Sequence, residues 1–182
     1  MTEPLRGVIA PNLTPFEPSG EIAHDLYVGH VKRFLDQGCV GVAPFGTTGE
    51  ALSVGIGERI VMLETLVSEG VDPGLMIPGT GVTNLADTVR LTRRAVDLGC
   101  AGAMVLPPFY FKDVPDDGLF AYFARLIDAV GHDDLRIYLY HIPRWPASAF
   151  PSRSCSACAR LSPTRSSASR TAPATGRTPG GS

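Results

Sequence analysis

The 182-residue sequence predicts an α/β fold built on a parallel sheet. Short apolar runs alternate with longer segments of helical period from the N-terminus to about residue 141, which is typical of consecutive βαβ units. A glycine closes each of the four helical segments, and a strand-like run follows within a few residues: Gly38, Gly70, Gly99 and Gly131. Their spacings of 32, 29 and 32 residues indicate that one βα unit repeats along the chain.

The first unit is expected to contain a strand, a loop and a helix, in that order. An apolar run at residues 5–11 predicts the strand, and the prolines and glycine that follow it predict the loop. Apolar side chains then recur at i, i+4, i+7 and i+8, which places them on one face of a helix: Tyr27, Val31, Phe34 and Leu35. Gly38 is expected to end this helix.

Three further helices are predicted by the same periodicity. Their apolar positions are Ile56, Ile60, Leu63 and Val67 in the second, Leu85, Val89 and Val96 in the third, and Leu119, Tyr122, Phe123, Leu126, Ile127 and Val130 in the fourth. The remaining strands are expected at residues 39–43, 75–78, 101–106 and 135–140. Five strands and four helices fit either a flavodoxin-like sheet or just over half of an eight-stranded barrel, and periodicity does not distinguish the two.

Composition excludes several classes of function. The chain is 44% hydrophobic and 19% charged, with a formal net charge of -2, so it offers no electrostatic reason to bind nucleic acid. No run approaches the ~20 apolar residues of a membrane span, and the N-terminus lacks the features of a secretory signal. We therefore expect a cytoplasmic protein with no membrane partner. The histidines show no ligand spacing, so we predict neither a metal nor another cofactor.

The loop after the second predicted strand contains the first candidate site. It has the sequence Gly46-Thr47-Thr48-Gly49-Glu50. Two glycines allow the backbone to approach a ligand closely, and consecutive N–H groups beside two hydroxyls can hold a carboxylate. The loop lacks the Gly-Lys-Ser/Thr ending of a phosphate-binding loop, and as an isolated pattern it also fits an ordinary glycine-rich turn.

Three more segments follow the ends of predicted strands, at residues 78–81, 106–112 and 139–143. Together with the loop at residues 46–50 they resemble, in order and spacing, the dihydrodipicolinate synthase / N-acetylneuraminate lyase family. The resemblance implies an α/β fold of the TIM (β/α)₈-barrel family, truncated here to about five strands and four helices. Residues 1–143 are then expected to form a partial barrel domain.

The resemblance also implies an activity and a set of site residues. In this family a lysine amine forms a Schiff base with the ketone of pyruvate or a related 2-oxo acid, so that a neighbouring carbon can make or break a C–C bond. Tyr140 would shuttle protons beside the imine. Thr47 would link Tyr140 to Tyr110, which in the family reaches in from a neighbouring subunit of a dimer or tetramer. The substrate carboxylate would be held by the loop: Thr48, Gly46 and Gly49.

Other interpretations of the aromatic residues stay open at this point. A tyrosine that ends a buried strand is usually a core residue whose hydroxyl is hydrogen-bonded, and that alone would explain Tyr140. Tyr110 lies between Phe109 and Phe111 and can also simply pack.

The lysine inventory does not fit an active lyase. The chain contains two lysines, Lys32 on the polar face of the first helix and Lys112 in the loop after the fourth strand. Relatives supply the Schiff-base lysine from a sixth strand in a Gly-x-Lys context, and the resemblance ends after Pro143. We therefore expect this chain to be inactive. The alternatives are a non-catalytic module that binds a 2-oxo acid, or a structural partner of a full-length relative.

Residues 144–182 are expected to be a non-homologous, disordered tail. Residues 151–182 contain eight serines and five arginines but no lysine or acid, whereas all 18 acidic residues precede them. Such a composition cannot bury a core, and a frameshift near residue 144 would explain it. Cys155 and Cys158 lack a second ligand pair, so we do not expect them to bind zinc.

Overall fold

A glycine in the left-handed conformation follows each of the four helices of the computed structural model, which describes residues 5–142. The helices are α1 (His24–Asp36), α2 (Ile56–Ser68), α3 (Leu85–Asp97) and α4 (Asp116–Val130). The φ angles of the closing glycines are 91°, 87°, 85° and 58° at Gly38, Gly70, Gly99 and Gly131. The sequence predicted all four helices and their ends, because a residue without Cβ adopts this conformation at little steric cost.

The strands follow one another in sequence order, and every pairing between them is parallel. β1 (Ile9–Ala10) pairs with β2 (Gly41–Val42), and β3 (Ala103–Val105) pairs with β4 (Ile137–Leu139). Single bridges connect Val42 to Met76 and Gly79 to Met104, so residues 76–79 join the two pairs into one row. Within residues 5–142, the outer edges of β1 and β4 have no strand partner.

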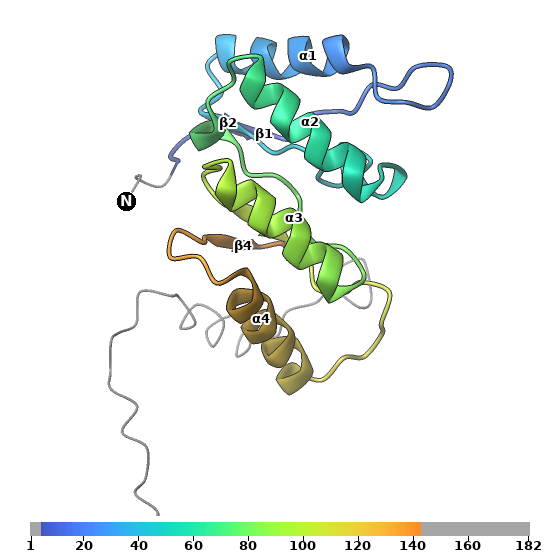
Figure 1. The fold of residues 1–182 in the computed structure, drawn as a ribbon, viewed down its shortest axis with the longest axis vertical. Coiled ribbons are helices and arrows are strands. Elements are labelled where there is room, and N and C mark those ends of the chain that lie inside the picture. The colour runs from blue at the N-terminus through green and yellow to red at the C-terminus, as the bar shows by residue number, and fades with distance from the viewer. Residues whose placement is uncertain (1–4, 143–182) are drawn as a thin grey trace, which may run out of the picture.

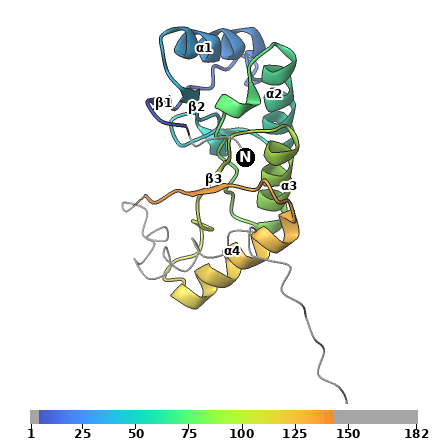
Figure 2. The ribbon, with the colours of Figure 1, turned by 90° about the vertical axis from the view of Figure 1, so that its left-hand side faces the viewer.

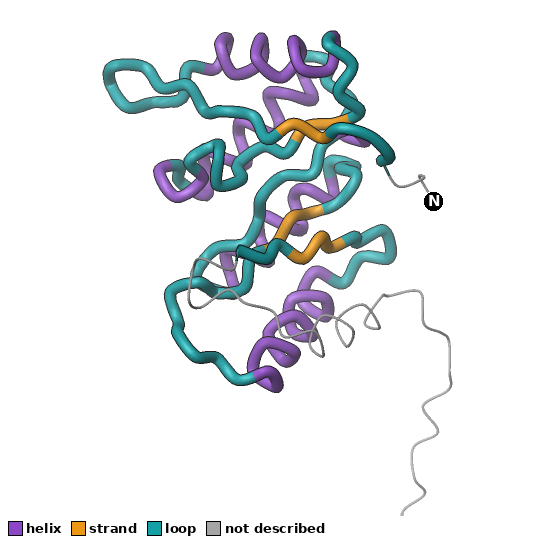
Figure 3. Tube along the Cα trace, turned by 180° about the vertical axis from the view of Figure 1, so that it is seen from behind, coloured by secondary structure: helices purple, strands orange, loops and turns teal. Residues whose placement is uncertain are grey.

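This order decides between the two folds that periodicity left open. A flavodoxin-like sheet has the order 2-1-3-4-5 and carries helices on both faces. Here the order is sequential and the helices all lie on one side of the strand row (Figure 1; Figure 2), as in the wall of a (β/α) barrel. Seen from the opposite side, the strands lie in front of the helices (Figure 3).

The third predicted strand is shorter than expected. In place of a strand over residues 75–78, the structure has a 3₁₀ turn at Pro73–Leu75, followed by an extended segment with only isolated bridges. Asp72 explains the turn, because its Oδ1 accepts a hydrogen bond from the N–H of Gly74 at 2.8 Å. Pro78 has no N–H to donate to a ladder, which limits the pairing that follows.

The core lies between the helices and the strand row, in two clusters. One joins α1 and α2 to β2, and its most deeply buried members include Tyr27, Val31, Met62 and Leu66. The other joins α3 and α4 to β3 and includes Ala103, Val105, Phe123 and Leu126. No helix within residues 5–142 combines the length and apolar character needed to cross a membrane. The predicted tail at residues 144–182 lies outside the described residues.

The closing glycines give a direct test of the helix ends. Replacing Gly38 by alanine should destabilise the fold by about 1–2 kcal/mol, because a Cβ there meets no neighbouring atom but forces a left-handed alanine. Gly29 lies inside the same helix, also in open space, so Gly29→Ala should instead stabilise it by roughly 0.5–1 kcal/mol. Urea unfolding of both variants measures the difference. Equal effects of the two substitutions would contradict the assigned end of α1.

Candidate functional site

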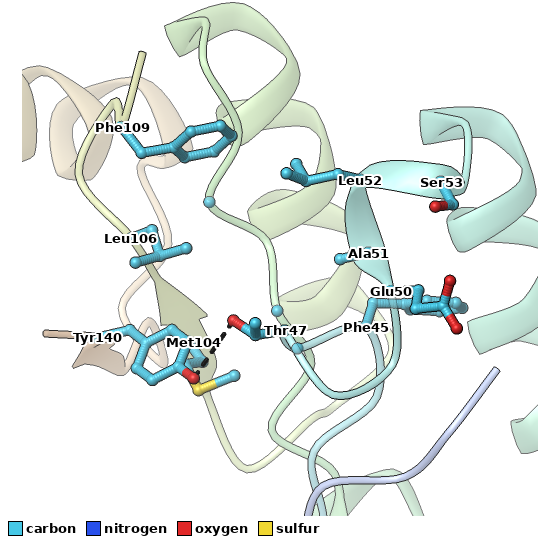
Figure 4. A pocket seen from close by; sticks show the side chains of 13 residues that line it. Phe45, Thr47, Glu50, Ala51, Leu52, Ser53, Met104, Leu106, Phe109 and Tyr140 are labelled. Carbon is cyan, nitrogen blue, oxygen red and sulfur yellow. Dashed lines mark hydrogen bonds between the residues drawn. The ribbon is translucent and has the colours of Figure 1, made fainter. Parts of the chain in front are cut away.

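A hollow of about 160 Å³ lies where the carboxyl ends of the parallel segments meet. It is lined by the turn after β2, by Gly79 and Gly81 after the third segment, by Met104 to Phe109 at the end of β3, and by Tyr140 after β4. Figure 4 shows the lining side chains converging from the turn after β2, from β3 with the loop that follows it, and from Tyr140. Strand carboxyl ends are where barrel enzymes place their ligands.

Thr47 and Tyr140, two of the predicted catalytic residues, meet in this hollow. The Tyr140 Oη donates to the Thr47 Oγ1 at 3.4 Å, across 93 residues of sequence (Figure 4). The backbone of Tyr140 is held in the row by its N–H, which donates to the carbonyl oxygen of Val105 at 3.0 Å. Tyr140 is therefore not a buried core tyrosine but one whose hydroxyl reaches the turn after β2.

The turn after β2 has an unusual backbone. Phe45 adopts a left-handed conformation with φ 56°, although its ring is only 1% exposed. Left-handed bulky residues are genuine outliers, with a cost of order 1–3 kcal/mol, and they cluster at functional sites. The ring of Phe45 is fixed by stacking on Tyr27, with centroids 5.5 Å apart. Packing of the Phe45 ring in the core thus compensates the backbone strain at Phe45 and places Gly46 and Thr47 at the hollow.

The turn presents a row of backbone donors. Among the hydrogen bonds within residues 5–142, none uses the N–H groups of Gly46, Thr47, Thr48 or Gly49. The hydrogen bonds that close the turn use the carbonyl groups of these residues instead. The N–H of Glu50 donates to the carbonyl oxygen of Thr47 at 3.2 Å, and the N–H of Ala51 donates to that of Gly46 at 3.3 Å. Successive N–H groups left free in a turn are suited to holding an anion such as a carboxylate.

Two buried polar side chains hold the turn in place. On one side the Thr14 Oγ1 donates to the carbonyl oxygen of Gly49 at 2.6 Å, 35 residues away. A Cβ on Gly49 would lie 2.8 Å from the carbonyl oxygen of Asn12, so only glycine fits there. On the other side the guanidinium of Arg59 donates from Nε to Val54 at 3.2 Å and from Nη2 to Ala51.

Burial governs the ionisation of the groups behind the turn. It lowers the pKa of Arg59, which has no carboxylate partner among the described residues. It raises the pKa of the Tyr27 phenol, an effect that the neighbouring Asn12 and Thr14 side chains partly oppose. The sequence did not single out Thr14, Arg59 or Tyr27 as part of the site. An arginine on an amphipathic helix is usually solvated, and no local pattern distinguishes this one.

The other predicted site residues are placed differently. Tyr110 is 76% exposed in the loop after β3, where its ring packs edge-on against Phe111, and it does not line the hollow. Within this chain, therefore, Thr47 and Tyr110 are not brought together. Thr48 is exposed and also lies outside the lining, next to Thr47. Gly46 lines the hollow. Gly49 does not line it, but lies on the other side of the turn, against the backbone of Asn12.

Neither lysine reaches the hollow. Lys32 lies on α1 and forms an ion pair with Glu69, at 3.6 Å between Nζ and Oε2. Lys112 lies in the exposed loop after β3 and is not among the lining residues. Residues 5–142 also contain no group of three or more histidine, cysteine, aspartate or glutamate side chains placed to hold a metal ion.

Comparison with known proteins identifies relatives of the same architecture. Residues 4–153 match the model of the dihydrodipicolinate synthetase family. An uncharacterized DapA-like lyase of Chloroflexus aurantiacus is 41% identical over 145 residues, which cover 79% of this chain and 48% of that protein. Among solved structures, dihydrodipicolinate synthase from Agrobacterium tumefaciens has 34% sequence identity to this chain. Its crystal structure matches the present one with a TM-score of 0.82, over 86% of this chain and 55% of that one.

A third similar protein was solved with a ligand. YagE, a prophage protein of E. coli K12 described as belonging to the dihydrodipicolinic acid synthase family, was crystallised in complex with pyruvate. It is 25% identical, with a TM-score of 0.74 over 85% of this chain and 50% of that one. The present chain thus spans about half the length of the relatives it matches.

The buried support of the turn can be tested by one isosteric substitution. Thr14→Val removes the donor to Gly49 and leaves a buried carbonyl unsatisfied, so we expect a loss of about 1–3 kcal/mol in the free energy of unfolding. Thr65→Val is the matched control, because it removes a hydroxyl-to-carbonyl bond from the exposed surface of α2 and should cost less than about 0.5 kcal/mol. Equal losses in urea unfolding would show that the turn does not depend on Thr14.

Proposed function

Because the chain belongs to the dihydrodipicolinate synthetase family, we propose that its described part forms one half of a Schiff-base lyase site for pyruvate or a related 2-oxo acid. The observation that carries this proposal is the contact between Tyr140 Oη and Thr47 Oγ1, beside the free N–H groups of the same turn. A 2-oxo acid has a carboxylate and a ketone on adjacent carbons. The carboxylate can bind the free N–H groups of the turn, and the ketone then lies next to the hydroxyls of Thr47 and Tyr140, which can transfer protons.

The two parts of this half-site have separate tasks. The N–H groups of residues 46–49 hold the carboxylate and so fix the position of the ketone. Imine formation adds an amine to the ketone and expels water, and both steps move protons at the ketone oxygen. A phenol next to that oxygen can deliver and recover those protons, and the hydroxyl of Thr47 orients the phenol.

A second copy of the chain would extend the hydroxyl relay. Tyr110 is too exposed to serve the hollow of its own chain, and its neighbour Phe111 is also largely exposed, at 56%. An exposed aromatic pair on a loop is a suitable contact for a neighbouring subunit. We place Tyr110 of a second copy next to Thr47, within a homo-oligomer.

The reactive amine is the part of the site that this chain does not provide. Its two lysines are Lys32, paired with Glu69, and Lys112, in the exposed loop. Neither lines the hollow, so the chain by itself should bind a 2-oxo acid without forming the imine. The function that follows is a lyase half-site in which binding and proton transfer are separated from amine catalysis.

Binding without covalent trapping is the direct test. Titration of the full chain with pyruvate, followed by ligand-observed NMR, should show binding, while borohydride treatment with labelled pyruvate should give no stable adduct. Thr47→Val should weaken pyruvate binding about fivefold, the effect of losing one hydrogen bond of ordinary strength. Thr65→Val, which alters a hydroxyl on the outer surface of α2, should leave the affinity unchanged.

Two results would overturn the proposal. A borohydride-stable adduct would show that one of the two lysines reacts. Equal affinity of the parent chain and Thr47→Val would remove the turn from the binding site.

A further inference from the structure

The hollow has an apolar side next to the residues that we propose bind pyruvate. Apart from Thr47, Glu50, Ser53 and Tyr140, the side chains that line the hollow are apolar, and they include Met104, Leu106, Phe109, Ala51 and Leu52. In Figure 4 the Phe109 and Leu52 side chains lie across the mouth from each other, with Leu106 below Phe109. They come from different βα units, because Leu52 belongs to the 3₁₀ turn Ala51–Ser53 and Phe109 to the loop after β3.

The exposure of Leu52 indicates that residues 5–142 do not fill this apolar side of the hollow. Its side chain is 61% exposed, although it borders the hollow. The hollow measures about 160 Å³. An apolar cavity of roughly 150 Å³ can hold a molecule the size of benzene, which has as many non-hydrogen atoms as pyruvate. The substituent of a larger 2-oxo acid would therefore extend out of the hollow along the exposed side chain of Leu52.

The charges around the hollow limit what that substituent can be. No lysine or arginine is among the described lining residues, and the one carboxylate there belongs to Glu50. In Figure 4 this carboxylate points to the side away from Tyr140 and Phe109. A second carboxylate on the ligand would contact apolar side chains and find no lysine or arginine to pair with. It would lose its hydration without compensation, which is unfavourable.

We infer that the site takes a 2-oxo acid with an apolar substituent, branched aliphatic or aromatic, packed between Leu52 and Phe109. The carboxylate and ketone lie against the turn at residues 46–49 and Tyr140, and the substituent extends to the apolar side. This inference rests on the proposed function and adds the substrate class to it.

The test compares four ligands on the full chain: pyruvate, 4-methyl-2-oxopentanoate, phenylpyruvate and 2-oxoglutarate. Each buried methylene adds about fourfold to affinity, so the two ligands with apolar substituents should bind at least about tenfold more tightly than pyruvate. The second carboxylate of 2-oxoglutarate should make it the weakest ligand of the four.

Leu52→Ser tests the contact at the mouth without removing a core residue. It should reduce the tenfold preference for 4-methyl-2-oxopentanoate over pyruvate to about threefold or less. Leu26→Ser is the matched control, because Leu26 is a leucine of similar exposure, 65%, on α1, which does not line the hollow. The control should alter neither affinity.

The possible failures are distinguishable. If pyruvate binds and the apolar ligands bind no better, the substrate class is wrong and the proposed function stands. If none of the four ligands binds, the proposed function itself fails. If Leu52→Ser changes the sedimentation of the chain but not its ligand preference, Leu52 serves a contact between copies and the inference is overturned.

Discussion

The parallel register of five consecutive segments is the constraint on which the candidate site depends. Because parallel strands all run in the same direction, their carboxyl ends lie at one edge of the sheet. Thr47 and Tyr140 follow two of these strand ends and therefore lie beside each other, although they are 93 positions apart in the sequence. The bridges from Val42 to Met76 and from Gly79 to Met104 keep the two strand pairs in one row. A shift of register at either bridge would separate the turn after β2 from Tyr140.

The turn after β2 combines local strain with distant support. Phe45 would not hold a left-handed backbone by itself, and Gly49 could not approach the segment after β1 if it carried a Cβ. Tyr27 from α1, Thr14 from the segment after β1 and Arg59 from α2 fix the turn from three directions. The free N–H groups are therefore preorganised, since the core has already compensated the cost of their geometry.

The sequence predicted the helices well because each prediction rested on several concordant signals, namely periodicity, length and a closing glycine. It could not predict the buried face of α2 in full. Of the four apolar positions expected to face the core, Leu63 is buried and Val67 packs against the core cluster, whereas Ile56 and Ile60 are only partly buried. Arg59, Met62 and Leu66, which the prediction did not include, are also buried. The carbonyl oxygens of Ala51 and Val54 accept hydrogen bonds from Nη2 and Nε of Arg59, and these acceptors are in place only once the chain has folded. Similarly, the proximity of Thr47 and Tyr140 was predicted by family resemblance, whereas periodicity alone assigned no role to either residue.

The central claim is that the described part of this chain forms the part of a lyase site that holds a 2-oxo acid and transfers protons, and that it does not supply the reactive amine. A chimera tests it most directly, with residues 1–142 joined to the C-terminal portion of the Chloroflexus aurantiacus relative, which lies beyond the half of that protein matched by this chain and in which we expect the Schiff-base lysine. We expect the folded chimera to give a borohydride-stable adduct with pyruvate, and Tyr140→Phe within it to slow adduct formation by about 100-fold or more. A folded chimera that forms no adduct, or forms it equally fast without the Tyr140 hydroxyl, would contradict the claim.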